Sequence, residues 1–316
     1  KGFTGIPEGA KVFADAGCDF IASSRLEQIQ GAINHGINAA YMLIRVPMLS
    51  EIEEVIASSA DYVVSYRQSD TTRNTPSSII KVEDDGQCIP EVRQWSLEKY
   101  KLVGSYCDIF TTGMKNKWNQ LVYIDLFAGA GYARIKETKS IYRSSALIAM
   151  SLPTPFTKYI LCEQDEERFN SLEQRVKRDF SHLNTTLILG DSNENVQDII
   201  NTIPKFGKGN TLLPFCFVDP YSLNLNFETI RRLGCNLMDF LILQALHMDA
   251  NRNFDKYIRE ENTRIANYLG MENWRDVFEQ NGCTNRKDFV KFLADQYQNQ
   301  MAKLSYRPTK HMHQIR

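Results

Sequence analysis

The first 66 residues alternate short apolar runs with amphipathic segments. Apolar runs at 19–24, 39–45 and 61–66 predict strands, and apolar positions at helical spacing predict helices at 25–35 and 51–58. A β-α-β-α-β order implies parallel strands, because each helical crossover returns the chain to the same end of the sheet.

Residues 67–92 break this alternation. They are polar and rich in turn-forming side chains, which predicts a linker between two domains. Beyond the linker, Ser96 is the predicted cap of a long helix, because apolar side chains from Tyr100 to Met114 follow it at helical spacing.

The predicted main domain, residues 93–250, repeats the alternation of strands and helices. Such an order predicts an α/β fold with a Rossmann-like, doubly wound sheet that binds ligands at the carboxyl ends of its strands. A polar, helical C-terminal segment is predicted from 251 to 316. The predicted strands are 121–126, 158–163, 185–189, 215–219 and 238–246, and the predicted helices are 145–152, 166–180, 196–203, 227–233, 254–269, 274–280 and 286–304.

The composition is that of a soluble globular protein, with 43% hydrophobic and 24% charged residues. No apolar run approaches the roughly 18–20 residues that span a bilayer, and the N-terminus lacks a basic-then-apolar signal peptide. Seven scattered cysteines without a C-x-x-C pair indicate reduced thiols and no structural zinc site. We therefore expect a cytoplasmic protein without a membrane segment.

The formal net charge of −1 offers no general attraction to nucleic acid. Its distribution is uneven, because 4 Lys/Arg stand against 8 Asp/Glu in the first 66 residues and 33 against 30 in the rest. The larger part can therefore carry a phosphate-binding face. A polar loop predicted at 132–142, with Arg134, Lys136 and Lys139, is one candidate, and a solvated loop is the alternative. A second basic group is expected to form a solvated helix face: Arg175, Lys177 and Arg178.

The first strand of the main domain ends in a glycine-rich turn. Asp125 closes the strand, and Phe127, Gly129 and Gly131 follow in the pattern D-x-F-x-G-x-G. Glycines allow a sharp turn and a close approach to a ligand, because no Cβ intervenes. The third Gly of a dinucleotide fingerprint is missing, so the pattern favours a ligand without phosphates. An acid here can meet the positive amino-acid end of S-adenosylmethionine.

Three later strand ends also carry acids. Glu163 can accept hydrogen bonds from two ribose hydroxyls, and Asp191 can accept one from an adenine amino group. The fourth strand ends in Asp219-Pro220-Tyr221, where the carboxylate and the Pro carbonyl can aim an amine and the ring can stack on a base. Each acid alone could instead cap the following helix. Four in succession predict an adenosine-shaped cofactor site beside a catalytic D-P-Y loop.

With these motifs, residues from about 93 to 316 resemble the three-Cys-motif partner family, whose core is methyltransferase-like. The resemblance implies a sheet of the S-adenosylmethionine methyltransferase type, S-adenosylmethionine as cofactor and a three-Cys-motif protein as partner. The D-P-Y loop is similar to that of base amino-methyltransferases, which implies a nucleic-acid substrate. Ser222 stands where the family usually has Gly, and family members continue beyond Arg316, so we expect a truncated C-terminal segment. The matching motifs are W-S-L-E-K-Y at 95–100, Y-I-D-L-F-A-G-A-G at 123–131, S-S-A-L at 144–147, F-V-D-P-Y at 217–221 and D-F-L-I at 239–242.

The first 66 residues resemble a different family, the pyridoxal-phosphate alanine or ornithine racemase barrel. Lys1 falls where that family carries its cofactor lysine. A barrel of eight strands needs on the order of 250 residues, so we expect a truncated fragment that has no racemase activity and binds no pyridoxal phosphate. An accessory βαβ piece is the alternative. The matching motifs are K-G-F at 1–3, I-P-E at 6–8, G-C-D at 17–19, S-R-L-E at 24–27 and L-I-R-V-P-M-L-S at 43–50.

Two functions follow from these motifs. The first is methyl transfer from S-adenosylmethionine to a nitrogen of a nucleic-acid base. The second is a catalytically silent module with a methyltransferase fold that acts with a partner protein.

Overall fold

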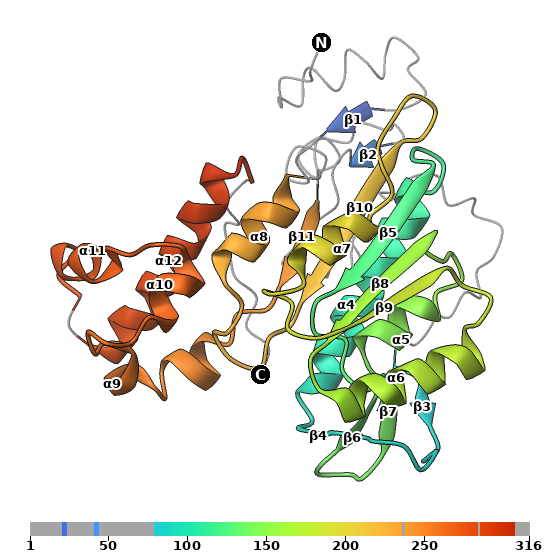
Figure 1. Ribbon diagram of the computed structural model, residues 1–316, viewed down its shortest axis with the longest axis horizontal. Coiled ribbons are helices and arrows are strands. Elements are labelled where there is room, and N and C mark those ends of the chain that lie inside the picture. Colours follow the sequence, from blue (N-terminus) through green and yellow to red (C-terminus); the bar gives the residue numbers. More distant parts are fainter. Residues whose placement is uncertain (1–20, 24–40, 44–78, 236–237, 284, 307–316) are drawn as a thin grey trace, which may run out of the picture.

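A computed structural model describes residues 21–23, 41–43, 79–235, 238–283 and 285–306 (Figure 1). Its centre is a five-stranded sheet in which every neighbouring pair is parallel. The spatial order is β11-β10-β5-β8-β9, so the chain runs outward from β5 in one direction and then in the other. The strands are β5 (Gln120–Asp125), β8 (Lys158–Glu163), β9 (Thr185–Leu189), β10 (Leu212–Val218) and β11 (Asp239–Ile242).

Helices cover both faces of this sheet, which confirms the predicted α/β fold class. Alternate side chains of β5 enter two different cores, since successive residues of a strand point to opposite faces. Val122 and Ile124 share one core with α7 (Val196–Thr202) and α8 (Phe227–Gly234). Leu121 and Tyr123 share the other with the remaining helices of the main domain. Those helices are α4 (Ser96–Met114), α5 (Ser145–Met150) and α6 (Glu166–Asp179).

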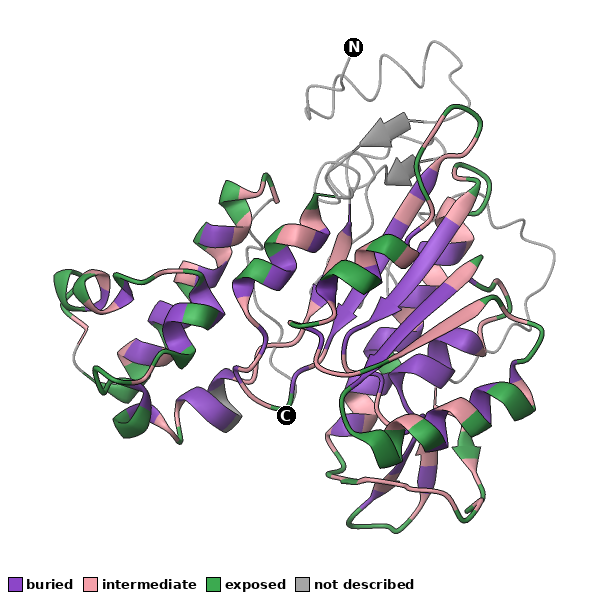
Figure 2. Ribbon diagram, in the orientation of Figure 1, coloured by how far each residue is buried: buried purple, intermediate pink, exposed green. Residues whose placement is uncertain are grey.

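Burial on both faces explains why the strands read as continuous apolar runs rather than as alternating patterns. All side chains of β5 from Leu121 onward are buried, and β8 is buried from Tyr159 onward (Figure 2). Strand β10 begins three residues before the predicted strand 215–219, since Pro214, a residue that disfavours strand interiors, nevertheless pairs with Val122 of β5.

The C-terminal segment packs against the sheet instead of standing apart from it. Trp274 and Phe289 are buried in the same core as Val122 and Ile230. Figure 1 shows this helical group beside α8, at the β11 edge. A single helix was predicted over 254–269, but two short helices form there. The segment consists of η1 (Leu246–Ala250), α9 (Phe254–Tyr257), α10 (Arg264–Leu269), α11 (Trp274–Gln280) and α12 (Arg286–Lys303).

A second, four-stranded sheet lies beyond the carboxyl end of β5 (Figure 1). The loop predicted at 132–142 is in fact a hairpin, because Tyr132 pairs with Arg143 across two antiparallel strands. Two further strands come from the predicted linker, so its part from residue 79 onward is structured, and 67–78 lies outside the described residues. The strands are β3 (Lys81–Val82), β4 (Glu91–Val92), β6 (Tyr132–Ile135) and β7 (Ile141–Arg143), in the order β3-β7-β6-β4.

Arg175 ties this second sheet to the main domain, and the prediction that it belongs to a solvated face is wrong. Its guanidinium is fully buried, donates to both carboxylate oxygens of Asp85 at 2.6 and 2.8 Å, and lies 4.1 Å from the ring centroid of Tyr132. It also donates to the carbonyl of Ala130, in the glycine-rich turn, at 2.6 Å. The segment around Asp85 covers a helix face that would otherwise be solvated, so the pattern of α6 alone could not reveal this burial.

The N-terminal fragment contributes two described strands. β1 (Ile21–Ser23) and β2 (Tyr41–Leu43) pair in parallel, as predicted for the first two strands of the fragment. The predicted third strand at 61–66, the two predicted helices and Lys1 lie outside the described residues.

Replacing Arg175 with Met is expected to destabilise the protein by about 3–5 kcal/mol, because the Asp85 carboxylate, 12% exposed, loses its main counter-charge. In the wild type, hydrogen bonds from the Arg175 guanidinium lower the pKa of Asp85 to about 2, although burial by itself would raise it. Urea unfolding measures the change.

The matched control is Lys177→Met, whose exposed pair with Glu173 on the same helix is worth no more than about 0.5 kcal/mol. Equal, small effects of both substitutions would contradict a structural role for Arg175.

Candidate functional site

The candidate site lies where the strand order reverses, between β5 and β10. In open α/β sheets the loops after these two strands diverge and leave a crevice at the carboxyl edge. Asp125 ends β5, opposite Phe217 of β10, and Asp219 follows β10 directly. The structure thus brings the predicted cofactor acid and the predicted catalytic acid to the same point of the sheet.

Asp125 is enclosed rather than open to a ligand. Its carboxylate is fully buried and accepts hydrogen bonds from Phe127 N at 3.1 Å, Tyr123 Oη at 3.0 Å and Ser145 Oγ at 2.8 Å. Burial raises the pKa of Asp125 to about 7 against these hydrogen bonds, and the nearby charge of Asp219 adds to the rise. Asp125 therefore shapes the start of the glycine-rich turn and joins it to α5.

The turn itself reaches across to the next strand. Gly129 has φ +66° and donates its N–H to Glu163 Oε2 at 2.7 Å, while Asp165 N donates to Oε1 at 2.9 Å. A Cβ on Gly129 would meet nothing within 4 Å, so there is open space beside its Cα. Gly131, with φ +86°, has no open space beside its Cα, because a Cβ there would lie 2.9 Å from a methyl carbon of Leu147. Gly129 is thus the glycine that leaves room, and Gly131 is needed for packing.

The turn after β9 links the neighbouring loops to each other. Asp191 Oδ1 accepts from Asn193 N at 2.7 Å, and Ser192 Oγ donates to the carbonyl of Leu126 in the turn after β5. Asn193 Oδ1 accepts from Asn226 N at 2.8 Å, at the start of α8. The predicted adenine ligand Asp191 therefore lies in a turn that is held from both sides.

The D-P-Y loop is paired with a residue of α4 whose role the sequence analysis missed. Lys99 Nζ of α4 lies 2.5 Å from Asp219 Oδ2, and the two side chains are only 9% and 22% exposed. Burial alone would lower the Lys99 pKa, but the Asp219 carboxylate outweighs it and the pKa is raised. The sequence did contain a sign that Lys99 is buried. It lies three residues after Ser96 and three before Leu102, on the face of the helix that packs inward. Tyr221, the last residue of the D-P-Y motif, is 90% exposed, unlike the largely buried pair of Lys99 and Asp219.

Asp249 anchors the far end of the same loop, and the sequence analysis missed it as well. Its buried carboxylate accepts from Leu223 N at 2.8 Å, from Tyr257 Oη at 2.8 Å and from Asn253 Nδ2 at 2.6 Å. The helical C-terminal segment thereby holds the chain that follows Tyr221.

The predicted basic face of the hairpin is largely neutralised. Arg134 pairs with Asp84 at 2.6 Å, and Lys139 pairs with Glu91 at 2.8 Å. Both acids come from the segment that was predicted to be a linker. Each of these two cations therefore has an acidic partner within the protein, in an exposed pair.

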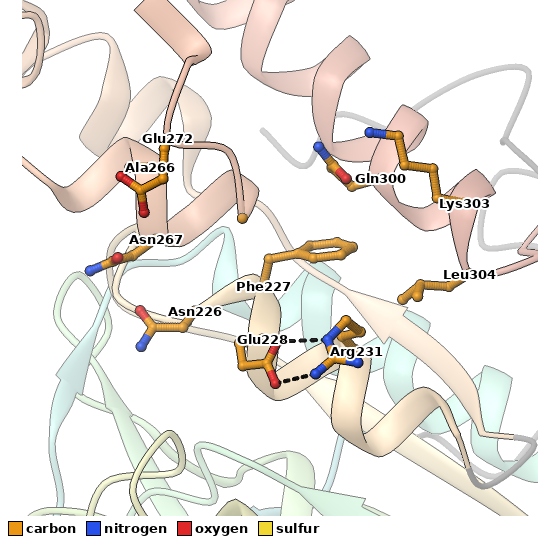
Figure 3. A pocket seen from close by; sticks show the side chains of 11 residues that line it. Asn226, Phe227, Glu228, Arg231, Ala266, Asn267, Glu272, Gln300, Lys303 and Leu304 are labelled. Carbon is orange, nitrogen blue, oxygen red and sulfur yellow. Dashed lines mark hydrogen bonds and ion pairs between the residues drawn. The ribbon is translucent and has the colours of Figure 1, made fainter.

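A separate cavity of about 400 Å³ lies between α8, α10 and α12 (Figure 3). Phe227, Asn267 and Gln300 line it, and Arg231 at its margin is held by Glu228 at 2.5 Å. None of the strand-end acids lines this cavity, so it is distinct from the candidate site. Within the described ranges, the structure contains no cluster of His, Cys, Asp and Glu suited to a metal ion, and no helix long and apolar enough to cross a membrane.

No protein family model matches the chain, and no curated protein matches it either.

The raised pKa of Asp125 predicts a pH-dependent stability. Folding favours the protonated carboxyl, because the folded pKa of about 7 lies above the usual 3.8 of an exposed Asp. The contribution of Asp125 is therefore present at low pH and is lost as the pH rises towards 7. Relative to Asp125→Asn, the wild type should lose about 2–3 kcal/mol of unfolding free energy between pH 5 and pH 8.

Urea unfolding of both proteins across that range tests this expectation. Other titrating groups, such as Asp239, are common to both proteins and cancel in the difference. A constant difference between the two would show that Asp125 is already ionised at pH 5.

Proposed function

We propose that this protein binds S-adenosylmethionine at the carboxyl edge of its five-stranded sheet and methylates an amino nitrogen of a nucleic-acid base. The observation that carries the proposal is the convergence of four acids at the ends of four adjacent parallel strands. Two of them, Asp125 and Asp219, flank the point where the strand order reverses. The same edge serves nucleotide-type ligands in other open α/β sheets.

The residues at this edge suit the cofactor. The open space beside Gly129 allows close approach of a ligand, and the Glu163 carboxylate stands beside it as an acceptor for vicinal hydroxyls. Asp191 follows on the next strand and can accept from the adenine amino group. When bound, the cofactor would supply an electrophilic methyl group, and the chain has to bring a nitrogen lone pair in line with it.

The D-P-Y loop supports an amine as the acceptor of that methyl group. Asp219 retains some exposure, so its carboxylate can accept an N–H bond from an exocyclic amine, and buried Pro220 restricts the chain between Asp219 and Tyr221. The exposed ring of Tyr221 offers a flat surface on which a base can stack. Together with the resemblance of this loop to base amino-methyltransferases, these features favour a nucleic-acid substrate.

A second candidate is a catalytically silent module that acts with a partner protein of the three-Cys-motif type. It is favoured by the number of protein contacts that the acids already make. Both oxygens of Asp125 and both oxygens of Glu163 accept hydrogen bonds from the chain itself, and Asp219 forms an ion pair. Such satisfied carboxylates could preserve the fold without any chemistry.

Isothermal titration with S-adenosylmethionine separates the two. We expect wild-type protein to bind, and Glu163→Gln to weaken binding by about tenfold or more, because a charged acceptor of ribose hydroxyls is lost. The matched control is Glu166→Gln, an exposed acid in the first turn of α6, which should leave the affinity unchanged. No heat of binding at millimolar cofactor would remove the methyltransferase proposal and leave the silent module.

Transfer itself is tested with methyl-labelled S-adenosylmethionine and random-sequence, single-stranded RNA and DNA 20-mers. Asp219→Asn should reduce label transfer by roughly 100-fold, because the amine is no longer aimed, while cofactor affinity stays within about threefold. Asp198→Asn, in the first turn of α7, is the control. Undiminished transfer by Asp219→Asn would exclude this loop as the site of chemistry.

A further inference from the structure

Lys99 is a buried cation at the base of the D-P-Y loop, in contact with one carboxylate and two aromatic rings. Its ammonium lies 2.5 Å from Asp219 Oδ2 and within 5.4 and 5.1 Å of the ring centroids of Trp95 and Tyr100. Removing a charge from water is costly, and a buried ion pair commonly adds little stability compared with apolar residues of the same volume. A lysine kept at such a place needs a reason beyond the fold.

The ion pair leaves the two oxygens of Asp219 unequal. Oδ2 receives the Lys99 ammonium, whereas none of the described residues donates a hydrogen bond to Oδ1. The Asp219 side chain is 22% exposed and Lys99 only 9%, so Asp219 is the member of the pair that is more accessible to a ligand. The ammonium lies on the long helix α4, beside the rings of Trp95 and Tyr100, and it in turn holds the carboxylate of Asp219.

We propose that Lys99 is a positioning residue for methyl transfer, which holds Asp219 as a fixed carboxylate with one oxygen turned to the substrate. This inference rests on the proposed function and deepens it. A carboxylate held in this way accepts an N–H, so the loop selects an exocyclic amine over a ring carbon or an unprotonated ring nitrogen.

The role of the pair in the reaction is one of orientation. The amine nitrogen forms a bond to the methyl carbon as the bond between that carbon and sulfur breaks, sulfur keeps the electron pair, and the surplus proton on nitrogen leaves to water. Lys99 stays protonated and touches neither reacting atom. It acts through Asp219 alone.

A double-mutant cycle tests this dependence. Lys99→Met should reduce kcat for label transfer to the random 20-mers by roughly 100-fold, with cofactor affinity from titration within about threefold of wild type. Lys99→Met combined with Asp219→Asn should lose less than about threefold beyond either single variant, because both remove the same oriented oxygen. Lys99→Arg, which retains a cation, should recover part of the rate. Lys101→Met, exposed on the same helix, is the control.

The pair itself has a readout that needs no cofactor. Because burial opposes the charge and Asp219 supports it, Asp219→Asn should lower the Lys99 pKa below that of an ordinary lysine. The ¹³Cε resonance of Lys99, assigned by its loss in Lys99→Met, reports this titration. A Lys99 pKa that does not respond to Asp219→Asn would show that the pair is absent in solution and would overturn the proposal.

The outcomes separate the two proposals. Wild-type protein that binds no cofactor or transfers no label removes the proposed function, and the role of Lys99 with it. Label transfer that is undiminished in Lys99→Met would remove the role of Lys99 and leave the proposed function standing. The same conclusion follows if the loss of kcat in the double variant equals the product of the two single losses.

Discussion

A parallel sheet has to be covered on both faces, and the arrangement of this protein depends on that constraint. Its crossover helices cover the faces, and the carboxyl ends of all strands then meet along one edge. The loops at that edge cannot be solvated independently, because they converge on a small volume. They bind one another instead: Gly129 to Glu163, Ser192 to Leu126, and Asn193 to the start of α8. The edge is therefore a rigid frame of polar contacts above an apolar core.

Buried charges in this frame fall into two kinds. Arg175 is surrounded on every side, by the Asp85 carboxylate, two carbonyl oxygens and the ring of Tyr132. It joins two sheets, and each of its three guanidinium nitrogens donates at least one hydrogen bond within the protein. Lys99 is also buried, at 9% exposure, but it contacts only one oxygen of an acid that still reaches the surface. The first arrangement joins parts of the fold, whereas the second leaves one oxygen of a partly exposed carboxylate without a protein donor among the described residues. The contrast is the physical ground for assigning Lys99 to the site.

The order of elements in the main domain was predictable because its apolar runs are long and each is bounded by turn-forming residues. The strands 158–163 and 185–189 and the helix 274–280 have the predicted bounds. The strand-end positions of Asp125, Glu163 and Asp191 were predictable for the same reason. Short elements were not. The hairpin strands β6 and β7 are only four and three residues long and flank a polar turn, so the segment was predicted as a loop; they pair with each other, and β3 and β4 extend the sheet on either side. Ser96 failed as a helix cap because Trp95 occupies the cap position and makes no side-chain bond there.

The sequence by itself determined the fold class and the acids at the strand ends, since apolar periodicity and local turn chemistry are written within a few residues. It did not determine what those acids touch. That Asp125 is closed within its own turn, that Asp249 holds the chain after Tyr221, and that Lys99 meets Asp219 across 120 residues of chain were decided by tertiary structure. The reason is that a hydrogen bond or an ion pair depends on distance in space, and residues far apart in a chain leave no local pattern of their pairing.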